Sequence, residues 1–127
     1  MKTVGARLVS VGSGQVTIEW PFRSELTQQH GFLHAGVVAA VVDSACGYAA
    51  LTMMPPDAAV LSVEFKVNLL KPAAGTHFRA IGKVIRAGRT LTVCGGEVHA
   101  HLDGKDSVIA IMQATMMAVR DSNGLVD

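Results

Sequence analysis

Aromatic residues and cysteines are scarce in this chain of 127 residues. It has one Trp, one Tyr and four Phe, and no basic stripe interleaves with them, so the composition gives no reason to expect a nucleic-acid partner. The two cysteines, Cys46 and Cys94, are too few for a disulfide framework. We expect both to be small core residues in a reducing compartment.

Charge is also scarce, because charged residues make up 17% of the chain and apolar residues 50%, with a net charge of +1. A small domain has a large relative surface to cover, so we expect part of its apolar surface to be buried against other copies of the chain. The sequence shows no signal-peptide pattern, and its longest uncharged stretch is interrupted by polar residues, which argues against a membrane span. We therefore expect a cytoplasmic protein.

The length predicts a single domain over residues 1–127, with a core over about 5–119 and a loose polar tail over 120–127. Turn residues divide the core into a hairpin, a helix and four strands. The hairpin covers residues 6–20, the helix covers 36–53, and the strands cover about 60–69, 77–86, 90–102 and 107–119. This order predicts an α+β fold in which a curved antiparallel sheet wraps one long central helix.

The first strand after the helix alternates apolar and polar residues, which is typical of a half-buried strand. The apolar face carries Leu61, Val63, Phe65, Val67 and Leu69, and the polar face carries Ser62, Glu64, Lys66 and Asn68.

Asp43 is the only formally charged side chain between Glu25 and Asp57, and it lies within an apolar run. Burying an unpaired carboxylate costs of the order of several kcal/mol, so we expect such a group to be solvated, to be paired with another group or to have a function. A helix through this run divides into a face of small residues and a face of bulkier ones. Gly36, Ala39, Ala40, Cys46, Gly47 and Ala50 share the face of Asp43, whereas Val37, Val38, Val41, Val42 and Tyr48 lie opposite. A structural Asp with one hydrogen-bond donor is the alternative, but we favour a functional one.

The element order, the segment His34-Ala-Gly-Val-Val-Ala-Ala-Val-Val-Asp43 and the later Gly88-Arg-Thr90 resemble the hotdog-fold acyl-CoA thioesterases, in particular the phenylacetate-degradation (PaaI-like) type. The likeness covers roughly residues 5–119. Its sharpest part is a His-Gly-Gly-like turn nine residues before an acidic residue. The chain departs from the family pattern at Ala35, where Gly is usual, and at Gln28, where Asn is usual. The resemblance implies a hotdog fold.

The resemblance also implies how a thioester is attacked. Backbone N–H groups at Ala35 and Gly36 form the oxyanion hole, because they lack intrahelical partners at the positive end of the helix dipole. Asp43 acts as general base, or as a nucleophile that forms a mixed anhydride. At a rise of ~1.5 Å per residue, Asp43 lies about 12 Å along the helix from Ala35. We therefore expect Asp43 of one chain to meet the loop from Gln28 to Gly36 of another, as in the family.

Other polar side chains support this site in the family. Gln28 supplies a side-chain amide, and His34 fixes the turn or contacts the substrate. Ser62 orients water beside the acid, although an ordinary solvent-facing serine is an equal alternative. Glu64 is expected on the same face as Ser62 and is a reserve candidate for the base.

Coenzyme A carries phosphates, and guanidinium groups suit phosphate oxygens. With the family likeness, we expect Arg86, Gly88, Arg89 and Thr90 to contact the pantetheine phosphate, whereas a hairpin with ordinary surface charge is the alternative. His99 and His101 share a strand face, but no third metal ligand of suitable spacing is evident. We expect no metal and no bound cofactor.

These features favour an acyl-CoA thioesterase that acts on a medium-chain or aryl acyl-CoA. Its partners would be the acyl-CoA and further copies of itself, in a homodimer with shared active sites that pairs into a homotetramer. A hotdog hydratase or dehydratase is one alternative, although His30-Gly-Phe-Leu-His34 lacks the proline of their Gly-His-Phe-Pro loops. A non-catalytic acyl-CoA binding module is the other.

Overall fold

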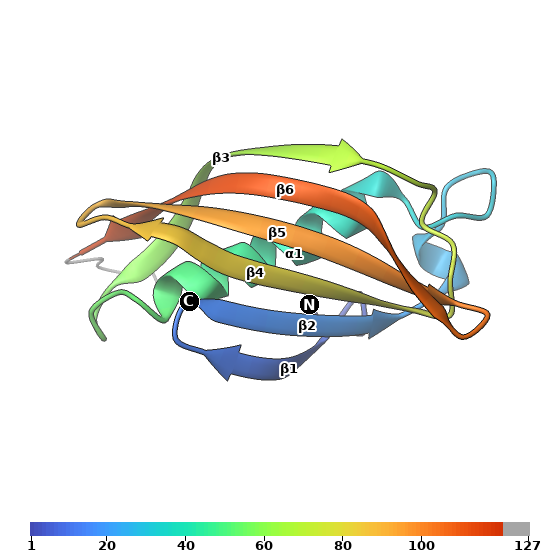
Figure 1. The fold of residues 1–127 in the computed structure, drawn as a ribbon, viewed down its shortest axis with the longest axis horizontal. Coiled ribbons are helices and arrows are strands. Elements are labelled where there is room, and N and C mark those ends of the chain that lie inside the picture. The colour runs from blue at the N-terminus through green and yellow to red at the C-terminus, as the bar shows by residue number, and fades with distance from the viewer. Residues whose placement is uncertain (121–127) are drawn as a thin grey trace.

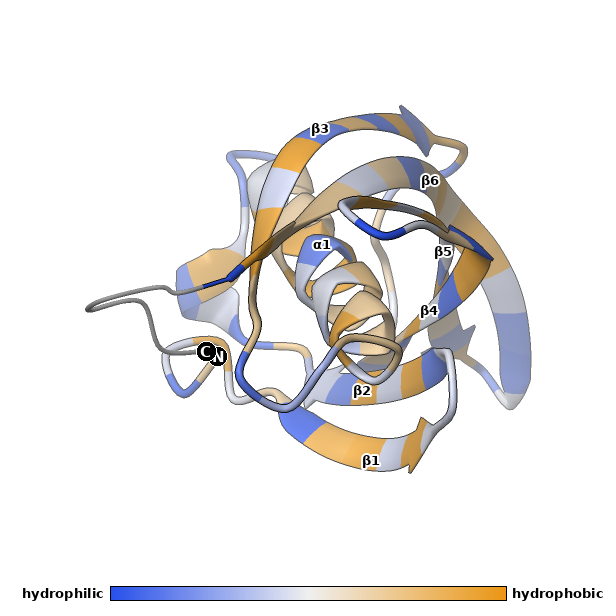
Figure 2. Ribbon diagram, turned by 90° about the vertical axis from the view of Figure 1, so that its left-hand side faces the viewer, coloured by the Kyte–Doolittle hydropathy of each residue, from blue (hydrophilic) through white to orange (hydrophobic). Residues whose placement is uncertain are grey.

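A computed structural model describes residues 1–120 of the chain and shows one long α-helix enclosed by a curved antiparallel sheet (Figure 1). The end-on view shows the strands curving around the helix (Figure 2). In chain order the elements are β1 (Arg7–Gly12), β2 (Gln15–Pro21), a short 3-10 helix (Ser24–Leu26), α1 (Ala35–Leu51), β3 (Ala59–Leu69), β4 (His77–Ala87), β5 (Leu91–Leu102) and β6 (Lys105–Val119).

The sheet has six strands in the order β1-β2-β4-β5-β6-β3, and all neighbouring pairs are antiparallel. The predicted α+β hotdog architecture and element order are confirmed. Of the predicted tail, all but Arg120 lies outside the described residues. Among residues 1–120, no helix is both long and apolar enough to cross a membrane.

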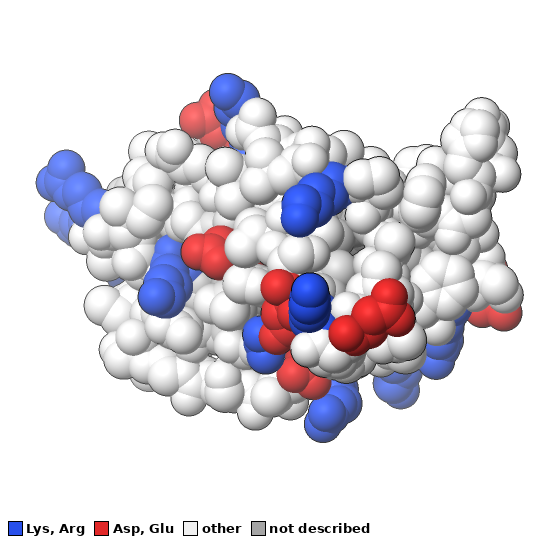
Figure 3. Space-filling model, turned by 45° about the vertical axis from the view of Figure 1, so that its right-hand side comes forward, with Lys and Arg blue, Asp and Glu red and all other residues white. Residues whose placement is uncertain are grey.

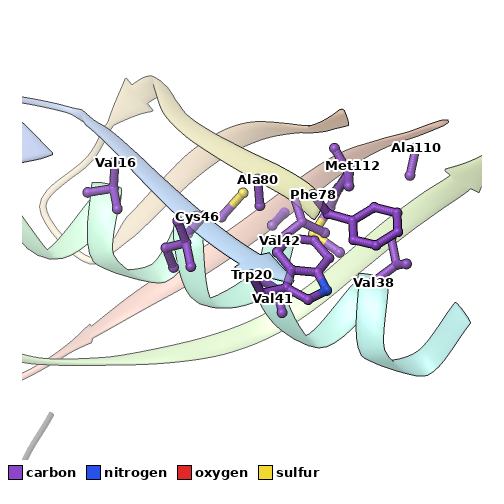
Figure 4. Packing of buried hydrophobic residues seen from close by; sticks show 14 of the residues in the cluster. Val16, Trp20, Val38, Val41, Val42, Cys46, Phe78, Ala80, Ala110 and Met112 are labelled. Atoms are coloured by element: carbon purple, nitrogen blue, oxygen red, sulfur yellow. The ribbon is translucent and has the colours of Figure 1, made fainter. Parts of the chain in front are cut away.

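The core lies between α1 and the concave face of the sheet (Figure 4). Trp20 on β2 and Phe78 on β4 stack with their ring centroids 5.4 Å apart and are almost fully buried. Cys46 and Cys94 are both fully buried, which confirms their predicted place in the core. Burial raises the pKa of the Cys46 thiol to about 12 and that of Cys94 to about 11, so both remain protonated at neutral pH.

Two glycines on neighbouring strands let the helix approach the sheet closely. Gly82 on β4 pairs with Gly96 on β5. A Cβ atom at Gly82 would overlap the backbone of Ala45, and one at Gly96 would overlap the side chain of Val42. The absence of both side chains therefore seats the middle of α1, and with it Asp43, against the sheet.

The helix is buried on more of its circumference than the predicted division into two faces allows. Cys46, Gly47 and Ala50, which were expected on the open small-residue face, are buried, and Tyr48 from the valine face is 42% exposed. The reason is that the sheet wraps the helix instead of covering one side of it. Only the first turns of the small-residue face remain open, with Gly36 and Ala40 exposed and Ala39 and Asp43 half-buried.

The predicted alternation along β3 is wrong, because a β-bulge at Val63 interrupts it. Ser62 pairs with the buried Met116, and the next paired residue, Glu64, lies opposite Thr115. The extra residue moves every following side chain to the other face. Since β3 is also an edge strand, Leu61, Val63, Phe65 and Leu69 are exposed, and of the predicted apolar face only Val67 is half-buried.

Candidate active site

A cavity of about 540 Å³ lies beside the start of α1. Its walls come from the loop before the helix, the first turns of the helix, the end of β3 with the following loop, and β6. The lining is mainly apolar. It consists of Gln28, Phe32, Leu33, His34, Ala35, Val38, Leu69, Leu70, Lys71, Pro72, Ala73 and Ile109. This volume is within the range of small-molecule sites.

His34 caps the helix that opens onto this cavity. Its Nδ1 accepts a 2.8 Å hydrogen bond from the Gly36 N–H, so His34 fixes the turn, as one of its two predicted roles required. Of the two predicted oxyanion donors, the Gly36 N–H lacks an intrahelical partner, as expected, but it already donates to the His34 side chain. The Ala35 N–H has no acceptor among the described residues and lies at the positive end of the helix dipole. Because Nδ1 is an acceptor, neutral His34 carries its proton on Nε2.

Gln28 holds the loop that forms one wall of the cavity. Its Oε1 accepts hydrogen bonds from the backbone N–H groups of His30 and Phe32. The Gln28 N–H also donates to the Phe32 carbonyl over 2.8 Å. The Nε2 donors of Gln28 have no partner within residues 1–120, so they are free to meet a ligand.

Asp43 lies outside this cavity lining and is paired with Ser62. The Ser62 Oγ–H donates to Asp43 Oδ1 over 2.8 Å. Ser62 is exposed, as the solvent-facing alternative has it, and its hydroxyl is at the same time bonded to Asp43. Within the described part of one chain, the structure brings Asp43 together with Ser62, and Gln28 together with His34 and Ala35, but it does not bring these two groups together in one cavity.

Glu64 does not share the face of Ser62, so that expectation is wrong. The bulge at Val63 turns Glu64 to the other face of the sheet, where its Oε1 accepts from Thr115 Oγ1 over 3.4 Å. Glu64 therefore cannot reach Asp43 or the cavity within one chain.

The hairpin with Arg86, Gly88, Arg89 and Thr90 lies at the opposite end of the molecule from the cavity. Figure 1 shows the β4–β5 turn at the end where α1 finishes, whereas the cavity residues lie where α1 begins. Gly88 is required here, because a Cβ atom would overlap the Leu91 carbonyl. Arg120 joins the hairpin by donating from Nη2 to the Arg89 carbonyl over 2.7 Å.

His99 and His101 lie on the convex face of the sheet and have acidic partners. His99 Nε2 is 2.9 Å from Glu97 Oε2, and His101 Nδ1 is 2.7 Å from Asp106 Oδ1. The hydrogen bond from His101 and the nearby Arg79 guanidinium lower the pKa of Asp106. Figure 3 shows acidic and basic side chains interspersed on the visible face. Within residues 1–120 no group of three or more potential ligands is arranged to hold a metal ion.

The sequence did not indicate the residues that form the cavity wall opposite the start of the helix. Leu69 to Ala73 end β3 and form the following loop, and Ile109 lies on β6. The available signal was the pair of apolar residues Leu69 and Leu70 directly before Lys71 and Pro72. Nothing local indicates that this partner is the loop before the helix.

Comparisons with known proteins indicate the family of the chain. The thioesterase superfamily model matches residues 30–106. A protein of Saccharolobus solfataricus, provisionally named an esterase, is 33% identical over 92 residues, which cover 72% of this chain and 65% of that protein.

Solved structures show the same fold. A thioesterase family protein from Silicibacter pomeroyi is 52% identical, with a TM-score of 0.94 over 94% of this chain and 88% of that one. The Escherichia coli PaaI protein from the phenylacetic acid degradation operon is 16% identical, with a TM-score of 0.81 over 93% of this chain and 82% of that one. At that identity the second likeness shows the fold alone.

Proposed function

Because the chain belongs to the thioesterase superfamily, we propose that it hydrolyses a medium-chain or aryl acyl-CoA to the free acid and coenzyme A. The family match and the thioesterase family protein from Silicibacter pomeroyi support thioester hydrolysis. Acyl-CoA as the substrate is part of the proposal. The observation that carries it is the free Ala35 N–H in an apolar cavity at the start of α1.

The thioester carbonyl is polarised at the start of the helix. The Ala35 N–H donates a hydrogen bond to the carbonyl oxygen, and this hydrogen bond becomes stronger as negative charge develops on that oxygen. Gln28 and His34 line the same cavity, and we expect the free Nε2 donors of Gln28 and the Nε2–H of His34 to strengthen this polarisation. Gly36 contributes indirectly, because its hydrogen bond to His34 fixes the imidazole.

Asp43 supplies the attack on the carbonyl carbon. As general base, its carboxylate takes a proton from water while the water oxygen bonds to the carbonyl carbon. The C–S bond then breaks, and the thiolate of coenzyme A leaves and is protonated. As nucleophile, the carboxylate itself bonds to the carbon, releases the thiolate and forms an anhydride that water hydrolyses. In both routes Ser62 holds Oδ1, which leaves Oδ2 without a partner among the described residues.

A complete site requires two subunits, since Asp43 and the cavity do not meet within one chain. The apolar edge strand β3 supports this assembly, because Leu61, Val63, Phe65 and Leu69 are between 41% and 54% exposed. The open small-residue stripe near Asp43 allows a second backbone to approach. We propose a homodimer that shares its sites and pairs into a homotetramer, and light scattering that shows a stable monomer would contradict it.

The same assembly accounts for the distant arginine hairpin. In a two-fold dimer joined through antiparallel β3 strands, the α1 C-terminal end of one subunit lies near the α1 N-terminal end of the other. The hairpin with Arg86, Gly88, Arg89 and Thr90 would then reach the phosphates of a coenzyme A whose thioester lies in the partner subunit's cavity.

Release of free thiol from a panel of aliphatic and aryl acyl-CoAs tests the proposed function. Wild type should turn over at least one class, and Asp43→Asn should lose about a hundredfold or more in kcat. Asp57→Asn, which removes an exposed acid from the loop after the helix, is the matched control and should keep full activity. Equal turnover by wild type and Asp43→Asn would contradict the assignment.

A further inference from the structure

The cavity lining carries one cationic side chain, that of Lys71. Lys71 is the only Lys, Arg, Asp or Glu among the residues that line it. Its side chain forms no ion pair with any residue in the described range 1–120. Lys71 is exposed, so its ammonium is available to a ligand at the rim.

The position of Lys71 is fixed by its backbone. The N–H groups of Leu70 and Lys71 donate to the Ile109 carbonyl over 2.8 and 3.3 Å, which ties this loop to β6. Two residues later, the Ala73 carbonyl accepts from the Leu33 N–H over 3.1 Å, which ties it to the loop before the helix. The backbone at Lys71 is therefore anchored between two walls of the cavity.

The surroundings of the cavity favour negative charge. The first turn of α1 carries no acidic residue to offset the positive end of its dipole, and the Ala35 N–H is free. Hydrolysis of a neutral thioester needs no ammonium at the rim. An anionic group elsewhere on the substrate, by contrast, would meet a cation that no carboxylate in the lining competes for.

We propose that Lys71 is a specificity-determining residue that binds an anionic group of the thioester substrate while the apolar walls hold its chain. This inference rests on the proposed function, because it assigns a role at the same site. The anion has two possible sources with shared chemistry, a phosphate of the coenzyme A portion or a terminal carboxylate on the acyl portion. Lys71 acts on binding and takes no part in the attack at the carbonyl.

Three thioesters separate the sources. Hexanoyl-CoA carries phosphates, adipoyl-N-acetylcysteamine carries only a terminal carboxylate, and hexanoyl-N-acetylcysteamine carries neither. Each is assayed with wild type, Lys71→Met, which removes the charge at similar length, and Lys71→Arg, which retains it. Lys83→Met is the matched control, since Lys83 is exposed, lies on β4 and is not among the residues that line the cavity. Thermal unfolding confirms that each variant is folded.

We expect Lys71→Met to raise KM about fivefold for one of the two anionic thioesters, with kcat little changed, and Lys71→Arg to restore most of it. A rise for hexanoyl-CoA alone identifies a phosphate, and a rise for the adipoyl ester alone identifies a carboxylate. Unchanged KM for both anionic esters would overturn the proposal. An equal rise for the neutral ester would also overturn it, because the loss would then not depend on substrate charge.

Binding without turnover separates this inference from the proposed function. Calorimetry with the thioether analogues of hexanoyl-CoA and of adipoyl-N-acetylcysteamine measures Kd for wild type and Lys71→Met, so that the phosphate and the carboxylate are each tested without turnover. If no thioester is hydrolysed but Lys71→Met weakens binding about fivefold, the proposed function fails and the role of Lys71 stands. If a thioester is hydrolysed and neither Kd nor KM changes in Lys71→Met, the proposed function stands and the role of Lys71 fails.

Discussion

Ser62 on the edge strand β3 donates its hydroxyl to Oδ1 of Asp43 on α1 over 2.8 Å. The bulge at Val63 follows Ser62 in the strand and turns the next polar residue, Glu64, to the other face of the sheet. The hydrogen bond fixes one carboxylate oxygen and thereby sets the direction of the other.

Replacing Ser62 with Ala should therefore lower kcat about tenfold and leave KM nearly unchanged, since a hydrogen bond to a charged group is worth roughly 1.5–3 kcal/mol. Steady-state thiol release measures both constants. Ser10→Ala, which removes an exposed hydroxyl from β1, is the control. A Ser62→Ala variant with wild-type kcat would show that Ser62 does not position Asp43.

His34 has a structural and a chemical role that two variants separate. His34→Ala removes the acceptor for the Gly36 N–H and should reduce the free energy of unfolding by about 1 kcal/mol. His34→Asn keeps a cap acceptor and should recover most of that loss, while kcat/KM stays low in both variants because the imidazole Nε2–H is gone. Urea unfolding and thiol release are the measurements. Full activity in His34→Asn would exclude the imidazole as a donor to the substrate.

Asp106 should stabilise the fold in a pH-dependent way. Its partners His101 and Arg79 lower its pKa in the folded protein, so its contribution is present at neutral pH and is lost as the pH falls through that lowered value. The stability difference between wild type and Asp106→Asn should therefore be greatest above about pH 4 and fade below it. Asp103→Asn in the adjoining β5–β6 turn is the control for urea unfolding across this range. A difference that grows on acidification would contradict the sign.

Cys46 and Cys94 should not react with thiol reagents in the native protein. Their pKa values of about 12 and about 11 leave almost no thiolate at pH 8, and both side chains are fully buried. Mass spectrometry after iodoacetamide treatment should find neither cysteine modified in buffer and both modified in urea. Rapid modification of the native protein would mean that the helix opens away from the sheet.

The sequence predicts the order of elements and the buried cysteines well, because hydrophobic period and turn residues are local properties. Helix α1 was predicted over 36–53 and covers Ala35–Leu51. The bulge at Val63 could not be predicted, since it depends on pairing with β6, and the face of Glu64 was wrong for this reason. The hydrogen bond that occupies the Gly36 N–H, and the role of Lys71 at the cavity rim, depend on tertiary contacts that no local pattern shows.

The central claim is that each active site combines Asp43 of one subunit with the Gln28 to Gly36 loop of another. Asp43→Asn and Gln28→Ala homodimers should each lose about a hundredfold or more in kcat/KM. A mixed dimer of the two variants, isolated through two different tags, contains one site with both residues intact if sites are shared. Thiol release by this mixed dimer should recover to about half of the wild-type value. Activity no greater than that of the two parent variants would place each site within a single chain and contradict the account.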